Sequence, residues 1–331
     1  MSFRICIIGC GSMSQSGHGP AFAKYAASHP HTELAACCDL DAAKAASYRQ
    51  RFGFARHYTD VPEMLNTEKP DAVCLIAPVN VTCELSCRIM EMRYPLLMEK
   101  PPGMNVGETD RMIAVAERCG VPNQVAFNRR YTPLIRELKR RLATQFQPGE
   151  IQHLRYDFTR IGRKDVDFST TAIHGIDTVR FLAGSDYRYI RFRYQALPQF
   201  GATVANIFMD CEMASGATAH LNFCPMSGAV TERATVHLHD NTFFLNIPVW
   251  KAFDAPGRIQ HVVKDAIQSD LSGTEISDGA EAFELGGFYG ENAAFFEDVR
   301  AGRHPAGDLR SARQSVDVAN CIRERRDEYR A

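Results

Sequence analysis

The chain has 331 residues, of which 45% are hydrophobic and 23% are charged, and its formal net charge is -1. This length and composition are typical of a globular protein with two domains, each large enough to have its own core. A charge near zero argues against nucleic acid or a membrane surface as the main partner, because both attract a basic face. No apolar run reaches membrane-spanning length, no signal peptide is recognisable, and the 11 cysteines form no CxxC pairs. We therefore expect a cytoplasmic protein with reduced thiols.

The first part of the chain alternates between apolar, β-rich runs and segments with helical spacing. Strands are predicted at 3–9, 32–38, 55–58, 72–77, 95–99 and 122–127, and helices at 20–28, 42–52, 61–66, 80–92 and 107–119. Strands separated by helices pair in parallel through right-handed crossovers. The fold class predicted for residues 1–127 is therefore α/β, a doubly wound parallel sheet.

A glycine turn follows the first strand. Gly9-Cys10-Gly11-Ser12-Met13-Ser14 stands between the strand 3–9 and the helix that begins near residue 20. Strand, glycine turn and helix are the setting of a dinucleotide-binding fingerprint, in which Gly9 permits the tight turn and Gly11 lets the backbone approach a pyrophosphate. The third small position is Ser14, so the match is to the looser form of this fingerprint, and an ordinary strand-to-helix turn is the alternative. The spacing to the next strand predicts an expanded loop over 14–19.

Asp39 ends the second predicted strand. An acidic residue there accepts hydrogen bonds from an adenosine ribose and repels a 2′-phosphate, which favours NAD over NADP. The alternative is that Asp39 starts a turn, since the segment 39–41 also fits a cap for the helix near Ala42.

Two further strand ends carry polar or rigid residues, at 77–80 and at Glu99-Lys100-Pro101. Ligands of a doubly wound sheet lie beyond the carboxyl ends of its strands, so these residues and the glycine turn are expected to form one site. Lys100 stands out because it ends an apolar strand on backbone restricted by the prolines after it. The residues predicted to bind the cofactor are Gly9, Gly11, Ser12, Met13, Asp39, Ala77, Pro78, Asn80, Glu99 and Lys100.

After about residue 128 the pattern changes to longer strand-like runs joined by short turns. A helix is predicted at 132–144, strands at 150–159, 186–196, 202–212, 216–224, 232–238 and 242–247, and helices at 287–300 and 309–326. Short turns between strands indicate an antiparallel sheet. We expect residues 128–331 to form an α+β domain for substrate binding and oligomerisation, with a large, mostly antiparallel open sheet. Its C-terminal helices are expected to pack back on the first domain, and the charged segment 323–328 is interpreted as a solvated helix face.

The predicted helix 168–184 places polar groups on one side. Thr170, His174 and Asp177 recur at i, i+4 and i+7. A histidine bonded within a core is the alternative to a functional role. His237 and His239 share a strand face but have no third ligand near them in sequence, so we expect a surface strand and no metal site.

These motifs together resemble the glucose-fructose oxidoreductase, inositol dehydrogenase and rhizopine-catabolism family (Gfo/Idh/MocA). The resemblance rests on Gly9-Cys10-Gly11 with Asp39, on Glu99-Lys100-Pro101, on 128–131 and on His174-Gly175-Ile176-Asp177. It implies a Rossmann domain followed by a substrate domain, a homodimer or homotetramer, and NAD(P)-dependent oxidation of a hydroxyl on a sugar, inositol or related polyol. It also implies that Lys100 and His174 act around the reacting carbon.

Elementary chemistry supports the same two residues. When hydride leaves a secondary alcohol, a base must accept the hydroxyl proton and positive charge must hold the oxygen. His174 suits the first task near neutral pH, and Lys100 suits the second. The chain departs from the family pattern at Thr170, where an aspartate is expected one turn before the histidine. Asp165 or Asp167 from the preceding loop is a candidate replacement.

A basic loop precedes the same helix. Arg160, Arg163 and Lys164 can bind a carboxylate, sulfonate or phosphate, although a solvated basic turn is the alternative. Arg129 and Tyr131 are further cleft candidates, while Arg130 can equally tie the two domains together. The residues predicted to contact substrate are Lys100, Arg129, Tyr131, Arg160, Arg163, Lys164, Thr170, His174 and Asp177.

The predicted function is an NAD(P)-dependent oxidoreductase acting on a sugar, inositol or sugar-acid-like substrate, with NAD as the favoured cofactor. Two alternatives stay open. One is a glycosidase that oxidises its substrate transiently with bound NAD, and the other is a non-catalytic regulator with the same fold.

Overall fold

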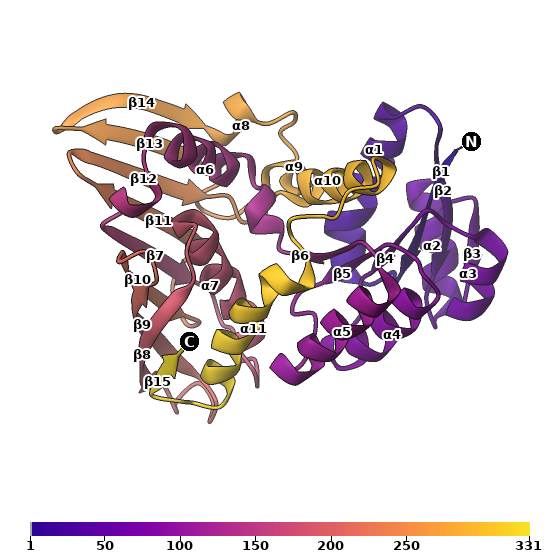
Figure 1. The fold of residues 1–331 in the computed structure, drawn as a ribbon, viewed down its shortest axis with the longest axis horizontal. Helices are drawn as coiled ribbons and strands as arrows, with labels where there is room; N and C mark the ends of the chain where they lie inside the picture. The colour runs from indigo at the N-terminus through magenta and orange to yellow at the C-terminus, as the bar shows by residue number, and fades with distance from the viewer. Residues whose placement is uncertain (1) are drawn as a thin grey trace. The chain divides into compact units, whose positions relative to one another are not determined.

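The computed structural model describes residues 2–331, which form two compact units (Figure 1). The first unit comprises residues 2–128 together with Phe288–Arg313, and the second comprises Arg129–Gly287 together with Gln314–Ala331. No helix in the described range is both long and apolar enough to cross a membrane.

The first unit is built on a six-stranded sheet in the order β3-β2-β1-β4-β5-β6, and each neighbouring pair is parallel. This confirms the doubly wound sheet predicted from the sequence. The chain reverses its direction of progress across the sheet between β1 and β4, and ligands of such sheets bind at this reversal. The strands are β1 (Phe3–Ile8), β2 (Thr32–Cys38), β3 (Arg56–Tyr58), β4 (Ala72–Leu75), β5 (Leu96–Glu99) and β6 (Asn123–Ala126).

The helices of this unit begin and end where local chemistry requires. Asp41, Asp60 and Asn105 cap the starts of α2, α3 and α5 by accepting backbone N–H groups, and Gly53 and Gly120 end α2 and α5 in the left-handed conformation. The helices are α1 (Gly19–Ser28), α2 (Ala42–Phe52), α3 (Val61–Glu68), α4 (Val79–Glu91), α5 (Val106–Cys119) and α10 (Phe288–Arg300).

The helix α10, far along the chain, belongs to the core of this first unit. Phe295 and Phe296 are fully buried there, and the Phe296 ring lies 5.8 Å from Phe22 and 4.9 Å from Tyr25, centroid to centroid. Burying a phenylalanine side chain stabilises a fold by about 1.5–3 kcal/mol. Residues from the second half of the sequence therefore help hold α1 on the parallel sheet.

The second unit is built on a nine-stranded sheet in the order β14-β13-β12-β11-β7-β10-β9-β8-β15. Its pairs are antiparallel except β7 with β10, so the expected mostly antiparallel sheet is confirmed. The strands are β7 (His153–Thr159), β8 (Tyr187–Ala196), β9 (Ala205–Met213), β10 (Thr218–Cys224), β11 (Thr231–Leu238), β12 (Asn241–Ile247), β13 (Arg258–Val263), β14 (Ala266–Ser272) and β15 (Glu328–Arg330).

Helices pack on one face of this sheet, with α6 against β12 and β13 and α7 against β7 and β10. Burial alternates along the strands because successive side chains point to opposite faces. The remaining helices are α6 (Pro133–Gln145), α7 (Ser169–Ala183), α8 (Gly273–Ile276), α9 (Ala282–Leu285) and α11 (Leu309–Arg323).

Three local predictions differ from the structure. The segment Ser14–His18 is a wide helical turn of the π type that continues into α1, and not a loop. Helix α11 ends at Arg323, and Glu328–Arg330 pairs with β8 as a strand, so 323–328 is not a helix face. The hairpin β13–β14 has no counterpart among the predicted strands, because its polar residues give only a weak strand pattern.

Candidate functional site

The glycine turn after β1 is shaped by close contact with the next strand. Gly9 has φ +96°, and a Cβ atom there would lie 2.0 Å from the carbonyl oxygen of Ile76, so only glycine fits. A Cβ on Gly11 would meet no atom within 4 Å. Ser12 and Met13, both exposed, begin the helical turn that follows. The turn therefore leaves open space beside backbone N–H groups, which fits the pyrophosphate of a dinucleotide.

Asp39 connects the end of β2 to this turn. Its Oδ2 accepts a hydrogen bond from the backbone N–H of Cys10 at 2.8 Å, and its Oδ1 accepts one from the N–H of Asp41 at 3.0 Å. The cap of α2 is Asp41, which accepts the N–H of Ala43 at 3.0 Å. Asp39 is therefore not the helix cap, and its carboxylate lies beside the glycine turn.

The other predicted cofactor residues follow neighbouring strands. Ala77 is half-buried, and Pro78 and Asn80 are exposed at the start of α4. Glu99 and Lys100 come at the end of β5, where Lys100–Pro101 is a cis peptide bond. The carboxyl ends of β1, β2, β4 and β5 thus bring the predicted cofactor residues to one edge of the sheet.

Glu99 is held from two sides. Its Oε1 lies 3.0 Å from Nε2 of His18, and its Oε2 accepts the backbone N–H of Lys100 at 2.9 Å. Burial raises the pKa of the Glu99 carboxyl, but the hydrogen bond and charge of His18 and the charge of Lys100 leave that pKa below its usual range. His18 is absent from the predicted site because it lies in the segment expected to be a loop.

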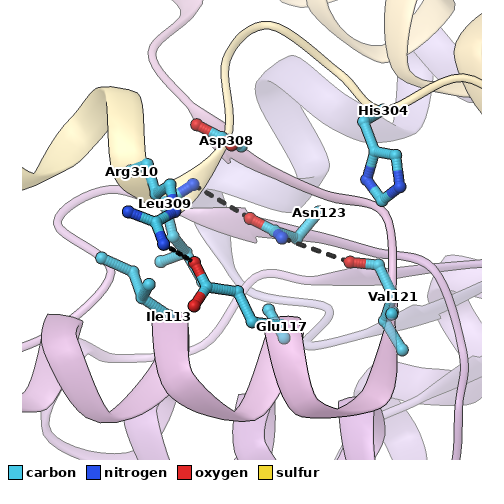
Figure 2. Close-up of a pocket in the computed structure, with 10 residues that line it drawn as sticks. Ile113, Glu117, Val121, Asn123, His304, Asp308, Leu309 and Arg310 are labelled. Atoms are coloured by element: carbon cyan, nitrogen blue, oxygen red, sulfur yellow. Dashed lines mark hydrogen bonds and ion pairs between the residues drawn. The ribbon is translucent and has the colours of Figure 1, made fainter.

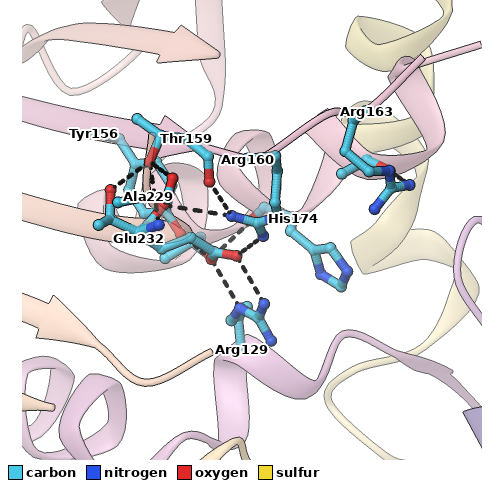
Figure 3. A network of polar contacts seen from close by, with 11 residues as sticks. Arg129, Tyr156, Thr159, Arg160, Arg163, His174, Ala229 and Glu232 are labelled. Carbon is cyan, nitrogen blue, oxygen red and sulfur yellow. Dashed lines mark hydrogen bonds and ion pairs between the residues drawn. The ribbon is translucent and has the colours of Figure 1, made fainter. Parts of the chain in front are cut away.

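In the second unit, a buried carboxylate joins two predicted arginines (Figure 3). Glu232, on β11, accepts hydrogen bonds from Nε and Nη2 of Arg129, both at 2.8 Å, from the Tyr156 hydroxyl at 2.8 Å, and from Nη2 of Arg160. Burial raises the pKa of the Glu232 carboxyl, but the charges of Arg129 and Arg160 hold it well below its usual range. Sequence reasoning missed Glu232, although it alternates in phase with the buried Ala234 and Val236 on β11, a pattern that places it on the inner face.

His174 lies beside this network on α7 and is partly exposed (Figure 3). When protonated, the His174 ring lowers the pKa of Glu232 through its charge. The two loop aspartates have other partners, since Asp165 pairs with Arg163 at 2.9 Å and Asp167 accepts the N–H of Ser169 at 2.9 Å. Thr170 occupies the position where the family pattern has an aspartate. Glu232 is a carboxylate whose charge interacts with His174 in its place.

The remaining predicted substrate residues differ in their exposure. Asp177 is buried and forms a bidentate pair with Arg130 at 2.7 and 2.6 Å, so Arg130 has a partner within its own unit. Thr170 is half-buried and donates a hydrogen bond to the carbonyl of Asp167 at 3.1 Å. Tyr131 is half-buried and Lys164 is exposed.

A cavity of about 310 Å³ in the first unit contains none of the predicted site residues (Figure 2). An ion pair between Glu117 and Arg310 and a hydrogen bond from the N–H of Leu309 to Asn123 Oδ1, at 2.9 Å, cross it. These contacts fix the start of α11 against α5 and β6.

Within residues 2–331 no group of three or more His, Cys, Asp or Glu side chains is placed to hold a metal ion. His237 lies 3.1 Å from the Thr242 hydroxyl, and His239 is exposed.

The parallel sheet and the glycine turn are typical of a dinucleotide-binding domain, and comparison with known proteins shows which proteins the chain is similar to. Residues 3–127 match the model of the oxidoreductase family with an NAD-binding Rossmann fold, Gfo/Idh/MocA. The match over this region confirms the resemblance seen in the sequence.

Curated relatives match over part of their length. The chain is 26% identical over 183 residues to the uncharacterized oxidoreductase YrbE of Bacillus subtilis, covering 51% of each protein. It is 28% identical over 191 residues to the myo-inositol dehydrogenase Hyg17 of Streptomyces leeuwenhoekii, covering 55% of this chain and 56% of the relative. The chain thus spans about half the length of these relatives.

Solved structures match over nearly the whole chain. A Gfo/Idh/MocA family oxidoreductase from Vibrio cholerae superposes with a TM-score of 0.82 at 21% identity, covering 98% of both chains. The 3-ketoreductase KijD10 from Actinomadura kijaniata, solved with NADP and TDP-benzene, superposes with a TM-score of 0.77 at 18% identity, covering 98% of both chains. At these identities the comparison establishes the fold of both units.

Proposed function

We propose that this protein is an NAD(P)-dependent oxidoreductase that transfers hydride between nicotinamide and a hydroxyl carbon of a sugar, inositol or sugar-acid-like substrate. The observation that carries the proposal is the edge of the parallel sheet where the open turn at Gly11, the Asp39 carboxylate and Lys100 follow neighbouring strands. If the turn only connected a strand to a helix, the close contact at Gly9 would be sufficient. The open space at Gly11 and the lysine on the same edge of the sheet are explained by a bound cofactor and substrate.

NAD is the favoured cofactor. The negative charge of Asp39 opposes a 2′-phosphate, and the residue after it is Leu40, which is 94% exposed and offers no positive charge. An NADP-preferring site is expected to place an arginine near this position.

Each functional side chain has a distinct role in the reaction. The oxidised nicotinamide, when bound, supplies the hydride acceptor. Lys100 holds the substrate oxygen with its ammonium group as the carbonyl develops, and His174 accepts the hydroxyl proton on a neutral ring nitrogen. The alcohol thus loses one hydride and one proton, and the reverse reaction returns both.

One observation favours a substrate of the sugar or inositol class, and a second favours a negatively charged substrate such as a sugar acid. Relatives of this chain bear the names myo-inositol dehydrogenase and D-apiose dehydrogenase. In the second unit, Arg129 and Arg160 both bond the carboxylate of Glu232 beside His174. Cations near the proton acceptor favour a substrate carboxylate.

The test is a panel of inositols, aldoses, polyols and sugar acids incubated with NAD and with NADP, monitored by the absorbance of the reduced cofactor. A preparation of the Lys100→Ala variant controls for contaminating dehydrogenases. We expect cofactor reduction with at least one substrate in the wild-type preparation alone. Equal rates in both preparations, or glycoside hydrolysis without net cofactor change, would contradict the proposal.

A further inference from the structure

We propose that His18 is a positioning residue for Lys100, acting through the carboxylate of Glu99. The inference rests on the proposed function, because it assigns a role in organising the lysine that holds the substrate oxygen. It draws on three segments of the first unit: the helical turn Ser14–His18, the end of β5, and α10.

Glu99 connects the histidine to the lysine. One carboxylate oxygen lies 3.0 Å from Nε2 of His18, and the other accepts the backbone N–H of Lys100 at 2.9 Å. Hydrogen bonds at both oxygens restrict the carboxylate and, through the N–H of Lys100, the backbone from which the lysine side chain starts. The hydrogen bond from His18 and the ammonium charge of Lys100 both lower the pKa of Glu99. The carboxylate also places a negative charge near the ammonium group.

The histidine is itself held on its other side. Its Nδ1 lies 3.1 Å from Nδ2 and 3.3 Å from Oδ1 of Asn292, and the same Nδ2 donates to the carbonyl of Phe288 at 2.7 Å. Because an asparagine side chain both donates and accepts, it can satisfy Nδ1 whether or not that nitrogen carries a proton. With Nε2–H directed at Glu99, neither protonation state leaves the ring without a partner.

His18 is completely buried by aromatic rings that pack closely around it. The ring is 0% exposed and meets the ring of Phe288 edge to face at 5.4 Å. A Cβ on Gly17 would lie 2.7 Å from the ring of Phe288, and a Cβ on Gly19 would lie 2.6 Å from the ring of Phe52. The residues on both sides of the histidine must therefore be small for the turn to approach α10 and α2 this closely. Burying a histidine and a carboxylate together costs desolvation free energy, which their mutual hydrogen bond must offset.

The experiment compares His18→Leu, His18→Gln, Glu99→Gln and the double variant His18→Leu/Glu99→Gln. His29→Gln is the matched control, because His29 also lies near a carboxylate of this unit, at 3.7 Å from Glu297, but does not contact Glu99. We expect His18→Leu and Glu99→Gln each to lower kcat by about 10–100-fold, as seen when residues that orient a functional group are removed. In His18→Leu, NAD affinity and the substrate KM are expected to change by less than about threefold.

Two readouts separate positioning from a general structural role. If His18 acts through Glu99, the double variant loses no more activity than Glu99→Gln alone, because the two changes remove one interaction. His18→Gln keeps an N–H donor and is expected to recover part of kcat. Loss of the donor in His18→Leu raises the pKa of Glu99, which the titration described below measures. Multiplying effects in the double variant, or equal losses in the leucine and glutamine variants, would overturn the inference.

A measurement without turnover keeps this inference distinct from the proposed function. Absence of hydride transfer in the wild-type protein contradicts the proposed function only. The pKa of Glu99 is then measured by carbon-13 NMR of glutamate-labelled protein, with Glu99→Gln identifying the resonance. A higher pKa in His18→Leu and an unchanged one in His29→Gln support the pairing, and the same pKa in all three proteins refutes it.

Discussion

Replacing Glu232 by glutamine is expected to destabilise the second unit strongly. The carboxylate is 0% exposed, and its partners Arg129 and Arg160 are 8% and 7% exposed, so solvent cannot replace its charge. Glutamine has nearly the same shape but removes the negative charge that the two buried guanidinium groups share. Removing one partner of a buried ion pair costs about 3–5 kcal/mol. For a unit of roughly 150–250 residues, this corresponds to a fall in Tm of about 6–20 °C.

A matched control is available on α6, where Glu137 also pairs with two arginines. Its Oε1 lies 2.8 Å from Arg140 and 2.7 Å from Arg141, and its pKa is lowered to about 2, mainly by the hydrogen bond from Arg140. Arg140 is largely exposed, so solvent replaces much of the lost interaction. Glu137→Gln is expected to cost about 1 kcal/mol or less. The assay is thermal unfolding followed by circular dichroism, and equal shifts in the two variants would refute the reasoning.

The pH dependence of the same comparison has a definite sign. The folded pKa of Glu232 lies well below its usual range, so its contribution to stability is complete above the unfolded pKa of about 4.3. That contribution is lost as the pH falls toward the folded pKa. The Tm difference between wild type and Glu232→Gln is therefore expected to shrink below about pH 4.3. A difference that stays constant between pH 7 and pH 3 would show that Glu232 has the same pKa in the folded and unfolded states, which contradicts the reasoning.

Three further predictions concern the proposed active site. Lys100→Ala is expected to abolish turnover while NAD binding and the fold persist, because its ammonium acts on the reacting oxygen; a near-normal kcat would make Lys100 structural. Thr170→Asp adds a carboxylate one turn before His174, which stabilises the imidazolium, raises its pKa and moves the acidic limb of the rate profile upward. An unmoved limb in Thr170→Asp, together with its loss in His174→Ala, would show that position 170 does not reach the ring. The wild type is expected to bind NAD about tenfold more tightly than NADP, a difference of about 1.4 kcal/mol in binding free energy. Asp39→Ala is expected to reduce this difference. Calorimetric titration that gave equal affinities of the wild type for both cofactors would contradict the role of Asp39.

The sequence by itself determined the parallel sheet and the edge at which its candidate cofactor residues lie. Strands buried on both faces read as continuous apolar runs, and glycines and acidic residues mark their carboxyl ends, so Gly9, Asp39 and Lys100 were identifiable from local pattern alone. The antiparallel second sheet was also predictable, because alternating burial and short turns are local features.

Only the tertiary structure decided which side chains meet across long separations. Glu232 lies 103 residues after Arg129 and 72 after Arg160. Its strand pattern places it on the buried face with Ala234 and Val236, but that pattern does not show which cations meet it there. His18 lies 81 residues before Glu99 and 274 before Asn292, inside a turn whose length predicted a loop. Hydrogen bonds and ion pairs between such residues depend on the packing of β11 against β7 and of α10 against the first helix. That packing is set by buried area summed over many side chains, and no short window of sequence contains it.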